Sequence, residues 1–70
     1  LGHGADAVRV LQQATAIAPD HPILNYHLGA AYVKAGRRPD AITHLKKAVT
    51  SGTDFDGLDE AKALLQETAG

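Results

Sequence analysis

The sequence predicts an all-α fold of about four helices, stacked as antiparallel helical hairpins, and three observations support this prediction. Apolar residues recur at steps of three and four through four separate segments, which is the period of an amphipathic helix. Proline and glycine interrupt the chain between these segments, where they end helices or form turns. No segment alternates polar and apolar residues for long enough to indicate a strand.

The first predicted helix covers residues 5–18. Its wide apolar side is formed by Ala7, Val8, Val10, Leu11, Ala14, Ile17 and Ala18. Pro19 ends this helix because proline lacks an amide donor and restricts the residue before it. Asp20 is expected to cap the second helix, with Pro22 in its first turn.

The second predicted helix covers residues 22–35 and carries a glycine inside its apolar run. Such a glycine costs about 1 kcal/mol of helix propensity relative to alanine, so Gly29 indicates a packing requirement. Leu28 and Tyr32 share its side of the helix, where we expect a neighbouring helix to cross closely. Gly36 is expected to end the helix in a left-handed conformation.

Two further helices are predicted after Gly36. One covers residues 39–50 and buries Ala41, Ile42, Leu45, Ala48 and Val49. The other covers residues 57–68 and buries Leu58, Ala61, Leu64 and Leu65. Asp56 is the expected cap of this last helix, and Phe55 is expected to fill a gap between helices.

A shift of 34 residues aligns the chain with itself. The matched pairs are Gly2 with Gly36, Asp6 with Asp40, Ala7 with Ala41, Leu11 with Leu45, Ala14 with Ala48 and Asp20 with Asp54. Two helices of about a dozen residues and their turns fill such a period, so the first and third predicted helices are equivalent.

These positions resemble the tetratricopeptide repeat (TPR) family. The family motif corresponds here to Asn25, Leu28, Gly29, Tyr32, Ala41, Leu45 and Thr53, with Ala48 as a further small residue of the hairpin. Asn25, Leu45 and Thr53 depart from the aromatic, phenylalanine and proline of the family pattern. The resemblance implies a right-handed solenoid, here the C-terminal piece of a longer, bacterial-type array.

Within a single domain of residues 1–70, the resemblance divides the chain into three parts. Residues 1–19 correspond to the B helix, the second helix of a repeat, from a preceding unit, and residues 20–53 correspond to one complete repeat. Residues 54–70 correspond to a C-terminal capping helix, reached after about two extra residues.

The resemblance also implies a non-catalytic scaffold that binds a peptide or partner protein through the concave face formed by its A helices, the first helices of the repeats. The residues expected on that face are Ile23, Tyr26, Ala30, Val33, Lys34, Lys62 and Gln66. The competing interpretation is that Ile23 and Tyr26 pack against the first and last helices. The alternative function is a structural array end that caps the solenoid or self-associates through Val8, Val10 and Ile17.

Composition and spacing argue against other classes of function. A net charge of −1 disfavours a nucleic-acid partner, and no apolar run reaches the roughly 18 residues of a membrane span. The chain has no cysteine, and His3, His21, His27 and His44 do not have the spacing of metal ligands on a helix.

The remaining polar residues also indicate no enzyme and no cofactor. The acidic residues around Asp54 lack the calcium-loop pattern, and no nucleophile elbow or glycine-rich phosphate loop occurs. The basic pairs Arg37–Arg38 and Lys46–Lys47 are expected to be solvated. The sequence does not indicate whether the protein belongs to the cytoplasm or to a bacterial envelope.

Overall fold

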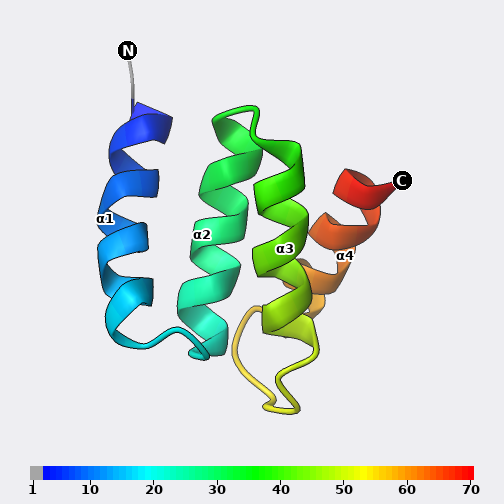
Figure 1. The fold of residues 1–70 in the computed structure, drawn as a ribbon. Helices are drawn as coiled ribbons and strands as arrows, with labels where there is room; N and C mark the ends of the chain where they lie inside the picture. The colour runs from blue at the N-terminus through cyan, green and yellow to red at the C-terminus, as the bar shows by residue number, and fades with distance from the viewer. Residues whose placement is uncertain (1–2) are drawn as a thin grey trace.

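The computed structural model describes residues 3–70, which form four α-helices and no strand (Figure 1). The helices are α1 (His3–Ile17), α2 (Pro22–Lys34), α3 (Arg38–Val49) and α4 (Leu58–Ala69). The predicted all-α fold is confirmed, and each predicted helix agrees with an observed one to within two residues at either end. Gly2, which the 34-residue shift matches with Gly36, lies outside the described residues.

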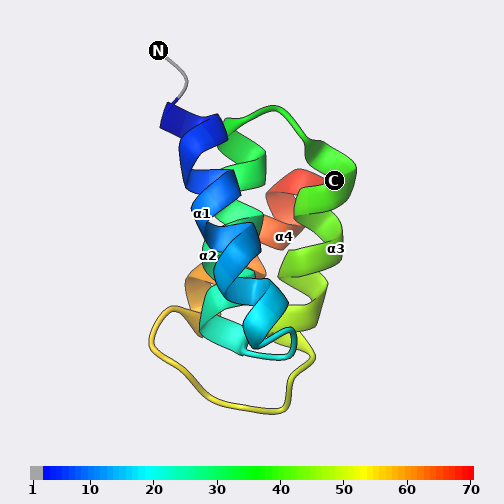
Figure 2. The ribbon, with the colours of Figure 1, turned by 60° about the vertical axis from the view of Figure 1, so that its left-hand side comes forward.

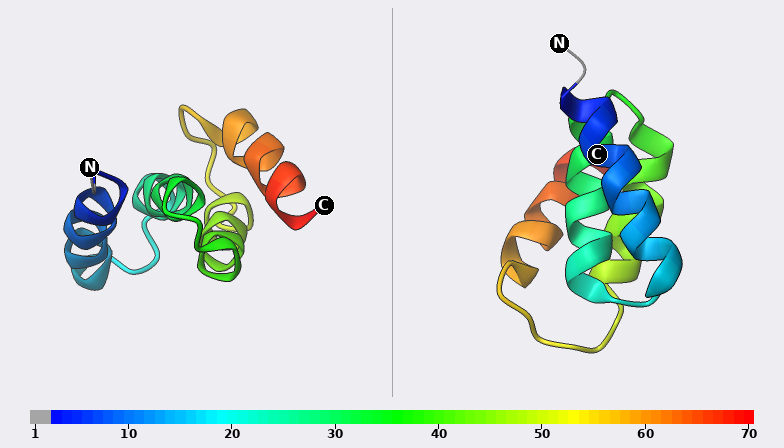
Figure 3. Two further views of the ribbon diagram at one scale, coloured as in Figure 1. Left: turned by 90° about the horizontal axis from the view of Figure 1, so that it is seen from above. Right: turned by 90° about the vertical axis from the view of Figure 1, so that its left-hand side faces the viewer.

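The helices form two layers, with α2 and α4 in one and α1 and α3 in the other (Figure 3). Each helix packs against the next in the chain, and α2 also touches α4. Helix α1 lies at one end of the row and, of the helices in the described range, contacts α2 alone (Figure 2). Helix α3 has neighbours on two sides, because it packs against both α2 and α4.

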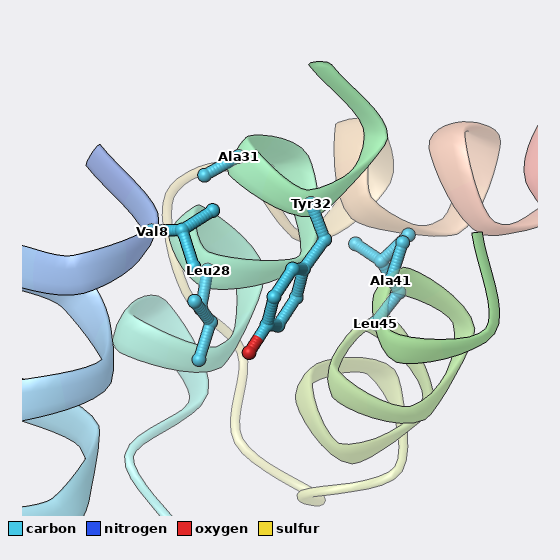
Figure 4. Close-up of a cluster of buried hydrophobic side chains, with 6 residues drawn as sticks. All are labelled: Val8, Leu28, Ala31, Tyr32, Ala41 and Leu45. Atoms are coloured by element: carbon cyan, nitrogen blue, oxygen red, sulfur yellow. The ribbon is translucent and has the colours of Figure 1, made fainter. Parts of the chain in front are cut away.

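The closest packing lies where α2 crosses α3 (Figure 4). A Cβ atom placed on Gly29 would lie 2.7 Å from Cγ of Leu45, so only glycine lets the two helices approach this closely. Leu28 and Tyr32 are buried beside this contact, and Ala41, Leu45 and Ala48 of α3 are 0% exposed. The close crossing predicted from Gly29 is confirmed. Full burial of a leucine side chain contributes about 1.5–3 kcal/mol.

Two predicted helix caps are wrong. His21, not Asp20, precedes α2, and its Nδ1 accepts a hydrogen bond from the amide of Leu24 at 3.4 Å. Asp20 is one residue too early, because a capping side chain must directly precede the first helical residue. Gly57, not Asp56, precedes α4, with a left-handed φ of +108° and no side-chain cap. The predicted left-handed glycine after α2 is confirmed, since Gly36 has φ +76°.

Asn25 stands where the family pattern has an aromatic residue, and it connects three parts of the chain. Its side chain is 1% exposed, and its Nδ2 donates to the carbonyl oxygens of Pro19 at 2.9 Å and His21 at 3.0 Å. Its Oδ1 lies 2.8 Å from Nδ1 of His44 on α3, so this histidine nitrogen carries the proton. The position therefore replaces apolar packing with a satisfied polar network.

Helix α1 presents its apolar residues differently from the prediction. Val8 was expected on an open surface together with Val10 and Ile17, but it is buried in the contact with α2. Val10 and Ile17 are 63% and 87% exposed. The reason is the helical period: Val8 points toward α2 with Leu11 and Thr15, whereas Val10 and Ile17 point away.

Candidate interaction surface

One side of α2 is covered by neither α1 nor α3. Ile23, Tyr26, Ala30 and Val33 are spaced by three, four and three residues, so they share this side. All four were predicted to line a binding face. Ile23 is 36% exposed, and the other three are half-buried. Lys34, at the end of the helix, is exposed.

Tyr26 is engaged by the segment that leads into α4. Its ring centre lies 6.2 Å from that of Phe55, and a Cβ atom on Gly57 would lie 3.1 Å from its Cε2. Phe55 is half-buried here, as expected of a residue filling a gap between helices. Tyr26 therefore helps to hold the α3–α4 connection, and only part of its ring is available to a ligand.

Val33 lines a pocket between the last turns of α2 and α4. The pocket measures about 280 Å³, and its other lining residues are Gly36, Arg38, Leu64, Glu67 and Thr68. Val33 and Leu64 provide apolar surface, while Arg38 and Glu67 place one positive and one negative group at its margin. Such a pocket suits an apolar side chain that is flanked by polar backbone groups.

Arg38 fixes one wall of the Val33 pocket. Its Nε donates to the carbonyl oxygen of Thr68 in the last turn of α4, where helix carbonyls lack intrahelical partners. A cation is also favoured at this negative end of the helix dipole. Arg38 thus joins the beginning of α3 to the end of α4, rather than being only solvated as the sequence suggested.

Lys62 and Gln66 are exposed on α4 but do not line the Val33 pocket. At about 100° per residue, both lie on the opposite side of α4 from Leu64. Lys62 and Gln66 therefore form a surface separate from the one that contains Val33, although the sequence analysis placed all three residues on one binding face.

Sequence reasoning missed Arg38, Glu67 and Thr68 as lining residues of this pocket. Nothing in their spacing connects them, because Arg38 is 29 residues before Glu67 and the two approach only where the end of α4 meets the beginning of α3. Leu64 was expected to be buried in the core, but the structure leaves it half-buried: it packs against the buried cluster and also lines the pocket.

Two histidines, His21 and His44, have local roles. His21 accepts the α2 cap hydrogen bond, and His44 bonds to Asn25. Burial lowers the pKa of His44; Lys47 lowers it as well, and Asp40 raises it. Over the described residues, no three metal-ligating side chains come together, and no helix is long and apolar enough to cross a membrane.

Antiparallel helices in two layers, with equivalent residues at a fixed interval, define a helical-repeat protein. A family model described as tetratricopeptide repeat matches residues 1–67, so the chain belongs to this family. No curated protein and no solved structure matches the chain. Tetratricopeptide repeats generally mediate binding to proteins or peptides and are typically non-catalytic scaffolds.

Proposed function

We propose that this chain binds an extended peptide or a segment of a partner protein along the exposed side of α2, with the Val33 pocket as its anchor point. The observation that carries the proposal is the pocket itself, which combines the apolar side chains of Val33 and Leu64 with the charged side chains of Arg38 and Glu67. An apolar ligand side chain would enter between Val33 and Leu64.

The margin of the pocket suggests how the ligand backbone is held. Arg38 uses Nε to bind Thr68, and its remaining guanidinium N–H groups are suited to a carbonyl or carboxylate of the ligand. Lys34 is exposed one residue after Val33 and adds a second positive group. Ala30 and Ile23 continue the apolar side of α2 away from the pocket. Lys62 and Gln66, on the other side of α4, are outside this binding path.

The experiment is a selection of random 12-residue peptides displayed on phage, followed by fluorescence polarisation of the selected peptides with purified variants. Val33→Glu and Lys34→Glu should each weaken binding by about tenfold or more, since one fills the pocket with a charge and the other reverses a charge beside it. Lys46→Glu makes the same charge change on exposed α3 and is the matched control. Equal affinities for the three variants would contradict the proposed binding face.

We also propose that α2 and α3 form the complete repeat, residues 20–53, with α1 as the second helix of a preceding unit and α4 as a cap. The α2–α3 crossing at Gly29 supports the repeat assignment. A shift of 36 residues aligns Leu65 of α4 with Gly29 of α2. Because leucine is much larger than glycine, a further helix could not approach α4 as closely as α3 approaches α2. If the assignment holds, Leu45→Ala should lower the free energy of unfolding far more than Leu11→Ala does. Urea unfolding of both variants tests the assignment.

A further inference from the structure

A second pocket lies between α1 and the turn that joins α2 to α3. It measures about 320 Å³, and its lining residues are Val8, Arg9, Gln12, Ala35 and Arg37. We call it the Arg9–Arg37 pocket. It shares no lining residue with the Val33 pocket, because Gly36 and Arg38 line that pocket while Ala35 and Arg37 line this one.

Arg37 is held in place at this pocket by two neighbours. Its Nε donates to Oδ2 of Asp40 at 2.9 Å, and its Nη2 lies 2.8 Å from the same oxygen. Its guanidinium carbon lies 4.7 Å from the centre of the Tyr32 ring, which is the geometry of a cation–π contact. These contacts do not use the Nη1 group of Arg37, so that group can donate to a ligand.

Gln12 is anchored to the same tyrosine. Its Nε2 donates to the hydroxyl oxygen of Tyr32 at 2.8 Å, and Tyr32 is buried. Because a side-chain amide nitrogen carries two N–H groups, one of them remains for the pocket. Arg9 lies three residues before Gln12, so its guanidinium extends from the same side of α1. The pocket therefore combines N–H donors from both sides with the apolar side chains of Val8 and Ala35.

The charges around the pocket favour a ligand with a single negative charge. Arg9 and Arg37 are both positive, and none of the described lining residues is acidic. Asp40 compensates one of the two charges through its contact with Arg37, which leaves one positive charge. A carboxylate matches this charge, whereas a phosphate group carries about −1.5 to −2 at pH 7.

A further helix packed beside α1 would leave this pocket open. At the 34-residue interval, Arg9 and Gln12 correspond to Thr43 and Lys46 of α3. Both of these residues are exposed, although α3 packs against α2 and α4. A helix that lay against α1 as α2 lies against α3 would therefore leave Arg9 and Gln12 accessible.

We propose that the Arg9–Arg37 pocket binds a glutamate side chain of a partner protein. The carboxylate accepts hydrogen bonds from Arg9, Gln12 and Arg37, and hydrogen bonds between ionised groups are the strong ones. The methylene groups of the glutamate lie against Val8 and Ala35. The carboxylate is assigned to a partner because tetratricopeptide repeats generally bind proteins or peptides. The site is independent of the Val33 pocket, since no residue belongs to both.

The probe for this site is a single glutamate blocked at both ends as amides, added to the isotope-labelled chain and followed by NMR at a constant ionic strength of about 0.1 M. We expect a dissociation constant on the order of 10 mM for one side chain. The largest shifts should fall on the side-chain N–H groups of Arg9, Gln12 and Arg37. Shifts confined to the residues of the Val33 pocket would overturn the proposal.

Three other ligands identify the chemistry that the pocket recognises. Blocked glutamine has the same shape without the charge and should bind at least about tenfold more weakly. Acetate lacks the methylene groups and should bind about threefold more weakly. Equal binding of acetate would indicate an adventitious ion only, equal binding of glutamine would exclude carboxylate recognition, and tighter binding of inorganic phosphate would indicate a phosphate site. Each of these results would overturn the proposal.

The matched variants are Arg9→Gln and Lys62→Gln, which remove the same charge from exposed positions. Arg9→Gln should weaken binding of blocked glutamate by about fivefold or more, because the carboxylate loses a charged donor. Lys62→Gln should leave the dissociation constant within about twofold, because Lys62 lies on α4, away from α1. The NMR spectrum of each variant also verifies that the fold is kept. Equal weakening by the two variants would show a general effect of charge and would overturn the assigned site.

Discussion

Helices α1 and α3 have equivalent sequences but very different surroundings. Ala7, Leu11 and Ala14 of α1 correspond to Ala41, Leu45 and Ala48 of α3 at the 34-residue interval. In α3 all three are fully buried, whereas in α1 the first is exposed and the other two are half-buried. The same residue types are therefore core in one helix and surface in the other.

The difference lies in the neighbours. Helix α3 is enclosed by α2 and α4, while α1 packs against α2 alone among the helices that the structure describes. Gly29 of α2 also admits Leu45 at a distance that a larger residue would forbid, and α1 receives no such contact along Leu11. An apolar stripe allows a helix to bury one side, and the neighbouring helices determine how much of that apolar surface is removed from water.

A polar contact made by α3 and not by α1 is a second difference between these two helices. His44 of α3 corresponds to Val10 of α1 at the 34-residue interval. His44 reaches the buried amide of Asn25 at 2.8 Å, whereas Val10 points to solvent. Equivalent positions thus serve as an anchor to α2 in α3 and as open surface in α1.

The largest expected effect comes from truncating the equivalent leucines. Leu45→Ala should lower the free energy of unfolding by about 2–5 kcal/mol, since it removes a fully buried side chain and leaves a cavity beside Gly29. Leu11→Ala should cost less than about 1.5 kcal/mol, because Leu11 is half-exposed. Urea unfolding followed by circular dichroism measures both, and equal costs would break the comparison between α1 and α3.

A smaller effect is expected from the pH dependence of the contribution that His44 makes to stability. The pKa of His44 is lower in the folded protein than its ordinary value of 6.5, so the unfolded chain binds the proton more tightly. The contribution of His44 to stability is therefore complete above pH 6.5, falls as the pH drops through 6.5, and is lost below the folded pKa.

The matched variant for this pH dependence is His44→Gln, which keeps an N–H donor for Asn25 and does not titrate. Urea unfolding at several pH values between about 5 and 8 should show a smaller loss of stability toward acid in the variant than in the unchanged chain. A loss of equal size in the two proteins would show that His44 is not responsible.

The smallest effect concerns Thr15, on the buried side of α1. Its hydroxyl oxygen is buried and has no hydrogen-bond partner within the part of the chain that the structure describes. The corresponding residue of α3 is Val49. Thr15→Val should raise the free energy of unfolding by about 0.5–1.5 kcal/mol, because it removes an unsatisfied polar group at nearly constant volume.

Thr43→Val is the control for the Thr15 prediction. Thr43 is exposed on α3, and its hydroxyl donates to the carbonyl oxygen of Pro39 at 3.1 Å. No gain in the urea midpoint is expected there. If the two valine variants changed stability equally, the unpaired hydroxyl of Thr15 could not be the cause.

Sequence reasoning succeeded where a property belongs to a short stretch of chain. Gly29 indicated the close crossing and Gly36 the left-handed turn, because both follow from the absence of a side chain at one position. The caps at Asp20 and Asp56 were wrong, since a shift of one residue at a helix end changes the capping position. Of the residues that line the Val33 pocket, the sequence placed Val33 alone on a binding face, because Arg38, Glu67 and Thr68 come from other helices and approach it only in the folded chain.

The sequence by itself determined four amphipathic helices, their repeat interval and the residues able to pack between them. Only the tertiary structure decided that Leu45 is enclosed while Leu11 is half open, that Val8 is buried while Val10 is exposed, and that Val33 meets Leu64. The physical reason is that helical periodicity is a local property of the backbone, whereas burial depends on which other helix occupies the adjacent space.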